Sequence, residues 1–374
     1  MTPRERLNAV TRFQETDRPW RLETIGFWDE TLARWAGEGM PRAAAAHAAA
    51  AFAYFRYDPM FPLPVGGADE PGFFPRFRRR TIEKTDKYKI VRDTAGCMVR
   101  VFRSGGSTIP EYLDFPVKSM DDFDHLRRRL RPGTPGRLDN PLFNAMIGLS
   151  AALRAPLGIV FSGVFGTHRH LLGFERLMTA YRDDPELLHE IAEQWVELCT
   201  GCMTRLAKRA RLDFVQFWED MCYRAGPMIS PGTFREFMSP YYAEVIARGR
   251  ELGVTGFWVD TDGDCTLLIP LFIEAGVNVM YPFEVQSGMD VVKVREEYGD
   301  RLAIMGGLDK RVLEKGREEI DGEVMAKALP LLKSGGYIPS VDHCVQPDVP
   351  LKNFNYFIRL LRYRIPGMSG IQRT

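Results

Sequence analysis

The feature that most constrains the fold is a regular alternation that begins near Asn140. Short runs rich in β-branched and aromatic residues alternate with longer stretches of helical period, as in repeated βα units around a parallel sheet. The runs are Leu157 to Gly163, Phe214 to Trp218, Gly256 to Val259, Val277 to Phe283, Leu302 to Met305 and Tyr337 to Val341. Six such units predict an α/β fold of the (β/α)8 TIM-barrel type.

The first 140 residues show a different pattern. We expect a strand at Thr24 to Phe27, an alanine-rich helix at Ala43 to Tyr54 and a second strand at Met60 to Val65. We also expect a β-hairpin at Tyr88 to Arg103, whose two arms are joined through Asp93 to Gly96. We interpret residues 1–140 as an N-terminal helical and hairpin elaboration that includes the first barrel strands. Residues 141–374 would supply the main barrel units, so that residues 1–374 form a single domain.

The charge balance bears on possible partners. The chain has 50 Lys and Arg against 49 Asp and Glu, a formal net charge of +1. This gives no basic field that would gather phosphates along a nucleic acid, so we expect no nucleic-acid partner.

The N-terminus carries charged residues where a secretory signal needs an apolar region, and no stretch approaches the ~20 apolar residues of a membrane span. We therefore expect a cytoplasmic protein without a membrane partner. The six cysteines in this chain do not form a dense disulfide framework, and we expect them to be reduced.

Acidic residues follow five successive predicted strands. In a barrel the carboxyl ends of the strands form the active-site face, so these residues would converge on one mouth. They are Glu219 and Asp220, then Asp260, Asp262 and Asp264, then Glu284, then Asp309 beside Lys310, and finally Asp342 beside His343. A single aspartate at such a position is often a helix N-cap, but helix capping does not predict the whole set.

Such a group of carboxylates needs a counter-charge, which a divalent cation, Lys310 or protonation would supply. Residues two apart in a strand point the same way, so Asp260 and Asp262 would both face inward. His343 would close a metal site, with Glu219 as a possible fourth ligand. These ligand types admit Zn²⁺, Fe²⁺ or Mn²⁺.

A metal-free site remains an alternative. In it the same carboxylates bind a basic substrate, and His343 acts as the proton donor. Across both interpretations we assign catalytic roles to His343, Glu219 and Lys310.

Other residues near the predicted strand ends are candidates for substrate binding. We select Trp28, His168, Glu284 and Tyr337. For the aromatic residues the competing interpretation is the barrel core, and for His168 it is a structural histidine with a hydrogen-bond partner. His170 lies two residues after His168, and one of the two could face the substrate, although a structural histidine is the more common case.

The stretch from Gly263 to Val277 (GDCTLLIPLFIEAGV) resembles the core motif of the uroporphyrinogen decarboxylase superfamily. Five further stretches follow the superfamily pattern in order: Gly26 to Thr31, Glu219 to Met221, Gly288 to Asp290, Met305 to Lys310, and Gly335 to Pro350. The resemblance covers nearly the whole chain. It implies a single TIM barrel and a possible homodimer.

The resemblance is closer to the cobalamin-linked methyltransferases than to the true decarboxylases. The decarboxylases have an arginine-bearing N-terminal segment, where this chain has acidic residues at Asp29 and Glu30. In the methyltransferases a His-x-Cys pair and a later cysteine bind zinc, and Asp260, Asp262 and His343 occupy the matching positions. The resemblance thus implies a divalent metal, with zinc as the leading candidate, and methyl transfer from a small methylated substrate to a corrinoid held by a partner protein. The alternative is a metal-free lyase of the uroporphyrinogen decarboxylase type.

Overall fold

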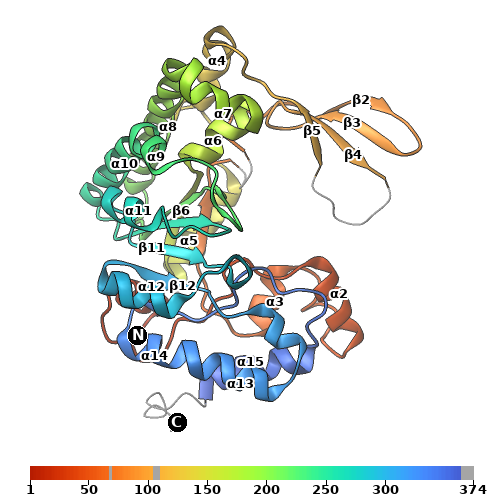
Figure 1. Ribbon diagram of the computed structural model, residues 1–374, viewed down its shortest axis with the longest axis vertical. Coiled ribbons are helices and arrows are strands. Elements are labelled where there is room, and N and C mark those ends of the chain that lie inside the picture. Colours follow the sequence, from red (N-terminus) through yellow and green to blue (C-terminus); the bar gives the residue numbers. More distant parts are fainter. Residues whose placement is uncertain (67–69, 104–109, 364–374) are drawn as a thin grey trace.

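A seven-stranded parallel sheet forms the centre of the molecule (Figure 1). The computed structural model describes residues 1–66, 70–103 and 110–363. Every neighbouring pair of strands in this sheet is parallel. In spatial order the strands are β1 (Phe61–Pro64), β6 (Leu157–Ser162), β7 (Phe214–Trp218), β10 (Gly256–Thr261), β11 (Val279–Pro282), β12 (Ala303–Met305) and β13 (Tyr337–Ile338). The six strands predicted after Asn140 are confirmed.

Residues 21–27 lie between the first and last strands of this sheet. The amide of Asp58, just before β1, donates to the carbonyl of Arg21 at 2.9 Å. On the other side Phe27 forms a parallel bridge with Val345, whose amide donates to the carbonyl of Gly26 at 2.9 Å. The predicted strand at Thr24 to Phe27 is thus an extended segment with one isolated bridge. The architecture is the expected (β/α)8 barrel.

Helices pack on the outside of the sheet, and several begin at a proline where a missing amide proton costs nothing. Pro141, Pro185 and Pro231 are such first-turn residues. The helices of the main barrel are α5 (Pro141–Ala152), α6 (Val164–Leu172), α7 (Phe174–Asp183), α8 (Pro185–Ala207), α9 (Pro231–Phe237), α10 (Ser239–Glu251), α11 (Ile269–Ala275), α12 (Val291–Tyr298), α13 (Arg317–Glu323), α14 (Leu329–Ser334) and α15 (Leu351–Tyr363).

Short elements complete the described barrel region. They are the 3-10 turns η1 (Arg128–Leu130), η2 (Val285–Ser287), η3 (Gly299–Arg301) and η4 (Lys310–Glu314), the π-helical turn η5 (Val324–Ala328), and the two-residue strands β8 (Cys222–Tyr223) and β9 (Gly226–Pro227).

Alternate residues of the barrel strands belong to two separate apolar clusters. Phe214 and Trp258 stack with ring centroids 4.1 Å apart, and together with Val279, Tyr281 and Ile338 they form the inner cluster. The residues between them in sequence, such as Val215, Phe217 and Val259, belong to the outer cluster shared with the helices. This two-residue period decides whether a polar residue at a strand end faces the barrel interior or the helices.

Helix α1 (Pro3–Val10) covers the amino ends of the strands. Its residues Leu7 and Val10 join the inner cluster. The amide of Arg4 donates to the carbonyl of Arg154, just before β6, at 3.0 Å. The barrel is therefore closed by α1 at the end opposite its mouth.

The predicted hairpin is part of a larger antiparallel sheet that projects away from the barrel (Figure 1). Its strands are β2 (Arg80–Lys84), β3 (Tyr88–Arg92), β4 (Met98–Phe102) and β5 (Glu111–Asp114). Strands β3 and β4 confirm the hairpin, whereas β2 and β5 were not predicted. The remaining helices are α2 (Asp29–Gly37), α3 (Ala48–Tyr54), which begins later than expected, and α4 (Met120–Arg127).

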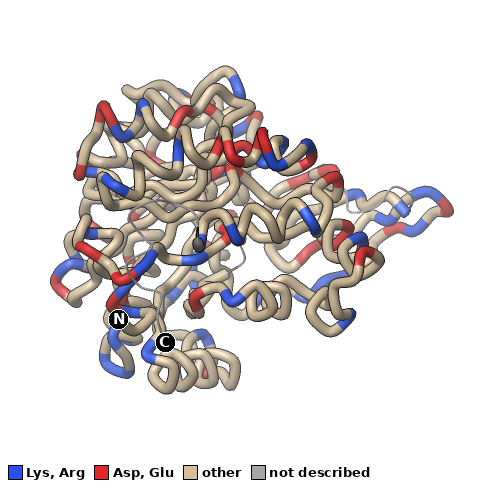
Figure 2. Tube along the Cα trace, turned by 90° about the horizontal axis from the view of Figure 1, so that it is seen from below, with Lys and Arg blue, Asp and Glu red and all other residues tan. Residues whose placement is uncertain are grey.

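Acidic and basic residues are interspersed along the chain trace (Figure 2), as the near-zero net charge suggests. Within residues 1–66, 70–103 and 110–363, no helix combines the length and apolar character needed to cross a bilayer. All six cysteines are free.

Candidate metal centre

Three side chains from separate strand ends meet at the barrel mouth. Asp262 follows β10, Glu284 follows β11 and His343 follows β13. Each offers one ligand atom, and these atoms lie within 4.8 Å of one another. All three residues are half-buried, which leaves the group accessible from outside. Two carboxylates and an imidazole are a donor set that suits a borderline divalent ion.

The Asp262 carboxylate is held by a tight turn. Gly263 has a φ of +76°, and a Cβ at this position would lie 2.5 Å from the carbonyl oxygen of Cys222. Only glycine fits there without a shift of the backbone. The Oδ2 of Asp262 lies 3.4 Å from Nε2 of His343, whereas its Oδ1 is buried and has no hydrogen-bond partner among the described residues. A buried, unpartnered carboxylate oxygen is costly and points to a ligand.

Glu284 connects this cluster to Lys310. Its Oε2 accepts a hydrogen bond from the amide of Gly263 at 3.0 Å, and its Oε1 lies 4.0 Å from Nζ of Lys310. The same Nζ lies 3.8 Å from Oδ1 of Asp342. Asp342 is fully buried and accepts from the amides of Lys310 and Val285 at 3.0 and 2.9 Å. Asp342 and Glu284 therefore fix the Lys310 ammonium beside the cluster.

The protonation of His343 is set by opposing effects. Burial lowers its pKa, but the hydrogen bond and the negative charge of Asp262 outweigh this effect, so the pKa is raised overall. In the metal-free state the imidazole is thus partly charged and paired with Asp262 near neutral pH. A bound cation would compete with that proton.

Asp260 faces the interior as expected, yet it does not belong to the three-residue group. It is opposite Trp218 and Tyr281 in the strand register, and its carboxyl group is hydrogen-bonded to Tyr281. Burial, followed by the charges of Asp262 and Asp220, raises its pKa well above the ordinary value. Burial thus disfavours the charged form of Asp260, and Glu284, which we predicted to bind substrate, is the third member of the cluster in its place.

Glu219 points away from the mouth. It is fully buried between β7 and the helices, where it accepts hydrogen bonds from the amides of Gly166 and Phe165 at 2.9 and 3.3 Å and from the hydroxyl of Tyr242. Burial raises its pKa to about 7, although these three bonds oppose the shift. Both oxygens already have partners, so the predicted roles as fourth ligand and catalytic residue do not match its place in the structure.

Three predicted substrate-binding residues lie elsewhere. The Nε2 of His168 is 2.9 Å from the carbonyl of Leu188, inside the helical layer. Tyr337 is fully buried in the outer cluster and donates to the carbonyl of Gly306 at 2.9 Å. Trp28 is 41% exposed at the start of α2. His168 and Tyr337 thus have structural partners. The amide of Trp28 donates to the carbonyl of Val345, two residues after His343, at 3.4 Å, but Trp28 is not one of the three cluster residues.

A cavity of about 750 Å³ that the sequence analysis did not identify lies beside β7. His170 and Trp218 line it with nearly parallel rings whose centroids are 5.9 Å apart. Burial lowers the pKa of His170 to about 3, and its Nε2 has no partner among the described residues. Arg169, which donates to the carbonyl of Asp220 at 2.8 Å, covers the other part of the Trp218 ring. Of the two histidines considered, His170 is therefore the one that reaches a cavity.

Comparison with protein families gives one match over most of the chain. The family described as uroporphyrinogen decarboxylase (URO-D) matches residues 90–363. A uroporphyrinogen decarboxylase of Chlorobium limicola is 25% identical over 237 residues, which are 61% of this chain and 62% of that protein. One of Pelodictyon phaeoclathratiforme is 25% identical over 297 residues, which are 73% of this chain and 76% of that protein.

The solved structures include one with the same architecture over nearly its full length. A methyltransferase from Methanosarcina mazei superposes with a TM-score of 0.63. The match covers 96% of this chain and 98% of that protein, at 15% sequence identity. At this identity the similarity establishes the fold, and the chemistry has to be argued from the site.

Proposed function

Since the chain belongs to the uroporphyrinogen decarboxylase family, we propose that it is a metal-assisted methyltransferase. It takes a methyl group from a small methylated substrate and passes it to a corrinoid carried by a partner protein. The observation that carries the proposal is the buried, unpartnered Oδ1 of Asp262 within a cluster of three potential ligands.

The residues present fit a divalent ion. Asp262, Glu284 and His343 would hold it, with zinc as the leading candidate, and the Nε2–Oδ2 separation of 3.4 Å is close to the ~3.4 Å between two ligands of a tetrahedral zinc ion. The ion would act as a Lewis acid that polarises the oxygen or nitrogen bearing the methyl group.

The residues around this cluster supply charge and orientation. When the methyl group leaves as a cation equivalent, its bonding electron pair remains on the substrate heteroatom, which gains negative charge. The Nζ of Lys310, positioned by Asp342 and Glu284, would stabilise that negative charge. The cavity beside Trp218 would hold the body of the substrate, because its apolar rings exclude water and Arg169 provides a polar anchor.

A metal-free decarboxylase remains the second candidate, since the curated relatives carry that name. In this reaction His343 or Lys310 would protonate the carbon from which carbon dioxide leaves. The porphyrinogen substrate of such an enzyme has many carboxylates and needs several cations at the mouth. Lys310 is the cation next to the cluster, and it is already shared between two carboxylates.

The test is metal analysis of the purified full-length protein and of the variant Asp262→Ala. We expect about one divalent ion per chain in the original protein, and a loss of affinity of at least about 100-fold in the variant. Methyl transfer from candidate ethers and amines to free cob(I)alamin, followed by absorbance, should fall in parallel.

The matched control is Asp264→Asn. This aspartate lies in the same turn but caps the amide of Thr266 and does not belong to the three-residue cluster. It should retain the metal. A protein that binds no divalent ion and releases carbon dioxide from a porphyrinogen would replace the proposal with the second candidate.

A further inference from the structure

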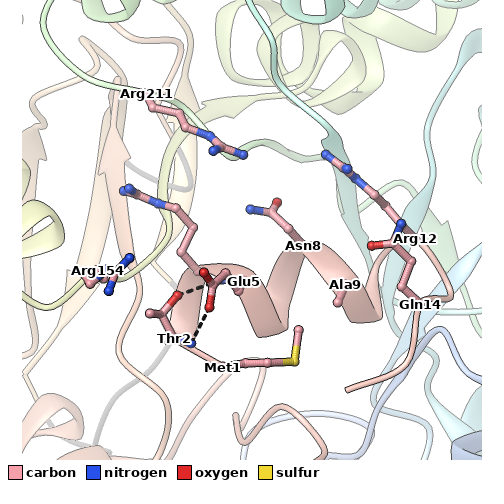
Figure 3. Close-up of a pocket in the computed structure, with 10 residues that line it drawn as sticks. Met1, Thr2, Glu5, Asn8, Ala9, Arg12, Gln14, Arg154 and Arg211 are labelled. Carbon is pink, nitrogen blue, oxygen red and sulfur yellow. Dashed lines mark hydrogen bonds between the residues drawn. The ribbon is translucent and has the colours of Figure 1, made fainter. Parts of the chain in front are cut away.

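A second cavity, of about 430 Å³, lies at the opposite end of the barrel from the mouth. It is formed by α1 and by the loops that precede β6 and β7 (Figure 3). Four arginines line it, namely Arg4, Arg12, Arg154 and Arg211. In Figure 3 the side chains of Arg211 and Arg12 extend toward the same space, next to the amide of Asn8.

Two of the polar side chains are held in place by one carboxylate behind the cavity. Asp213 has a fully buried side chain and accepts hydrogen bonds from Nε of Arg4 and from Nδ2 of Asn8, both at 3.0 Å. The Nε of Arg211 lies 3.5 Å from the same carboxylate. One negative charge therefore serves two guanidinium groups and leaves an excess of positive charge.

The other two arginines lack such partners. Arg12 and Arg154 are exposed, and no hydrogen bond or close ion pair of either side chain is found within the described residues, although Arg154 interacts electrostatically with the Glu5 carboxylate. Glu5 is the only acidic residue that lines the cavity, and it caps α1 by accepting from the amide of Thr2 at 2.8 Å. Four guanidinium groups thus face two carboxylates in a chain whose overall charge is +1.

Like charges that converge without a structural partner repel one another, and a bound anion relieves that repulsion. Guanidinium groups form paired hydrogen bonds with phosphate oxygens, and the volume lies within the ~300–1,000 Å³ of small-molecule sites. We propose that this cavity, the foot pocket, binds a small polyanion of the phosphate class, at a site distinct from the mouth.

The test is calorimetric titration of the full-length protein with pyrophosphate at constant ionic strength. The double variant R12Q/R154Q should weaken binding by about tenfold or more, because it removes two guanidinium groups that would donate charged hydrogen bonds to the anion. The control R79Q/R80Q removes two exposed arginines in and next to β2, far from α1, and should bind as the original protein does. Unsaturable binding, or equal losses in both variants, overturns the proposal.

The unfolding temperature of the unliganded protein distinguishes a binding role of Arg12 and Arg154 from a structural role, because the two roles predict changes of opposite sign on substitution. Without ligand, R12Q/R154Q should unfold at the same or a higher temperature than the original protein, since it removes repulsion. Pyrophosphate should raise the unfolding temperatures of the original protein and of R79Q/R80Q by the same amount, and that of R12Q/R154Q by less. A lower unfolding temperature for the unliganded variant, or tighter binding of an acidic peptide such as hexaglutamate, contradicts a small-molecule site.

Discussion

Glu219 and Asp262 follow neighbouring strands of the same sheet, and they differ in how their oxygens are satisfied. Both Glu219 oxygens accept hydrogen bonds from the protein, in a buried space between β7 and the helices. Asp262 keeps one buried oxygen without a partner at the mouth. The comparison teaches that an acidic residue at a strand end is a candidate ligand only when the fold leaves its oxygens unused.

The largest effect expected from this comparison is the loss of the Glu219 carboxylate. Glu219→Ala leaves the amides of Phe165 and Gly166 and the hydroxyl of Tyr242 without their acceptor in a buried space. We expect the free energy of unfolding to fall by about 4 kcal/mol, measured by urea denaturation. Glu219→Gln keeps one acceptor oxygen and should lose about half as much. A loss below about 1 kcal/mol for the alanine variant would contradict a structural role.

The pH dependence of stability tests the same group. Its pKa is about 7 in the folded protein against an ordinary value of 4.5, so between these values the folded state holds a proton that the unfolded chain has released. The contribution of Glu219 to the free energy of unfolding therefore falls by about 3 kcal/mol as the pH rises from the lower to the higher of these pKa values. It stays constant at higher pH.

The measurement for this prediction is the difference in unfolding free energy between the original protein and Glu219→Gln, at about pH 5 and about pH 8. Taking the difference removes the contributions of other buried acids such as Glu23, whose pKa is also raised by burial. A difference that is constant with pH would show that Glu219 is ionised throughout.

Tyr242→Phe should have a smaller effect, because it removes one of the three donors and leaves the carboxylate in place. We expect a loss of about 1 kcal/mol in unfolding free energy. The hydrogen bond from Tyr242 lowers the pKa of Glu219, so its removal should also move the pH transition of the preceding prediction upward. No movement would mean that this hydroxyl does not interact with the ionised carboxylate.

The smallest effect is expected at the mouth. In metal-free protein, Asp262→Asn should change the unfolding free energy by no more than about 0.5 kcal/mol, because Oδ1 has no partner among the described residues and the partly exposed pair of Oδ2 with His343 contributes little. The same carboxylate-to-amide change at Glu219 serves as the comparison. A large loss of unfolding free energy in Asp262→Asn would mean that this carboxylate stabilises the turn. Asp262 and Glu219 would then not differ in the way described above.

The barrel could be predicted from the sequence because its strands have distinct composition and regular spacing. The position of Glu219 could also have been inferred. Asp260 is opposite Trp218 in the strand register, so Trp218 faces the barrel interior if Asp260 does. Glu219 is the next residue after Trp218 and therefore faces the helices. The two-residue period that predicts the orientation of Asp260 and Asp262 would also have placed Glu219 toward the helices.

Other parts of the site depend on contacts between distant segments. Nothing near Glu284 in the sequence indicates that its carboxylate accepts from the amide of Gly263, which lies after the preceding strand. The choice between His168 and His170 depends on how α6 is rotated against α8, which the packing of the two helices sets. Strands β2 and β5 become recognisable only through their pairing with the hairpin.

The walls of the cavity beside Trp218 come from two parts of the molecule, the projecting antiparallel sheet and the barrel. Tyr112 and Phe115, at the end of the projecting sheet, form one side, and α6, α7 and β7 of the barrel form the other. None of the three metal-cluster residues comes from the projecting sheet. Substitutions in that sheet can therefore change the shape and polarity of this cavity while the three-residue cluster stays constant.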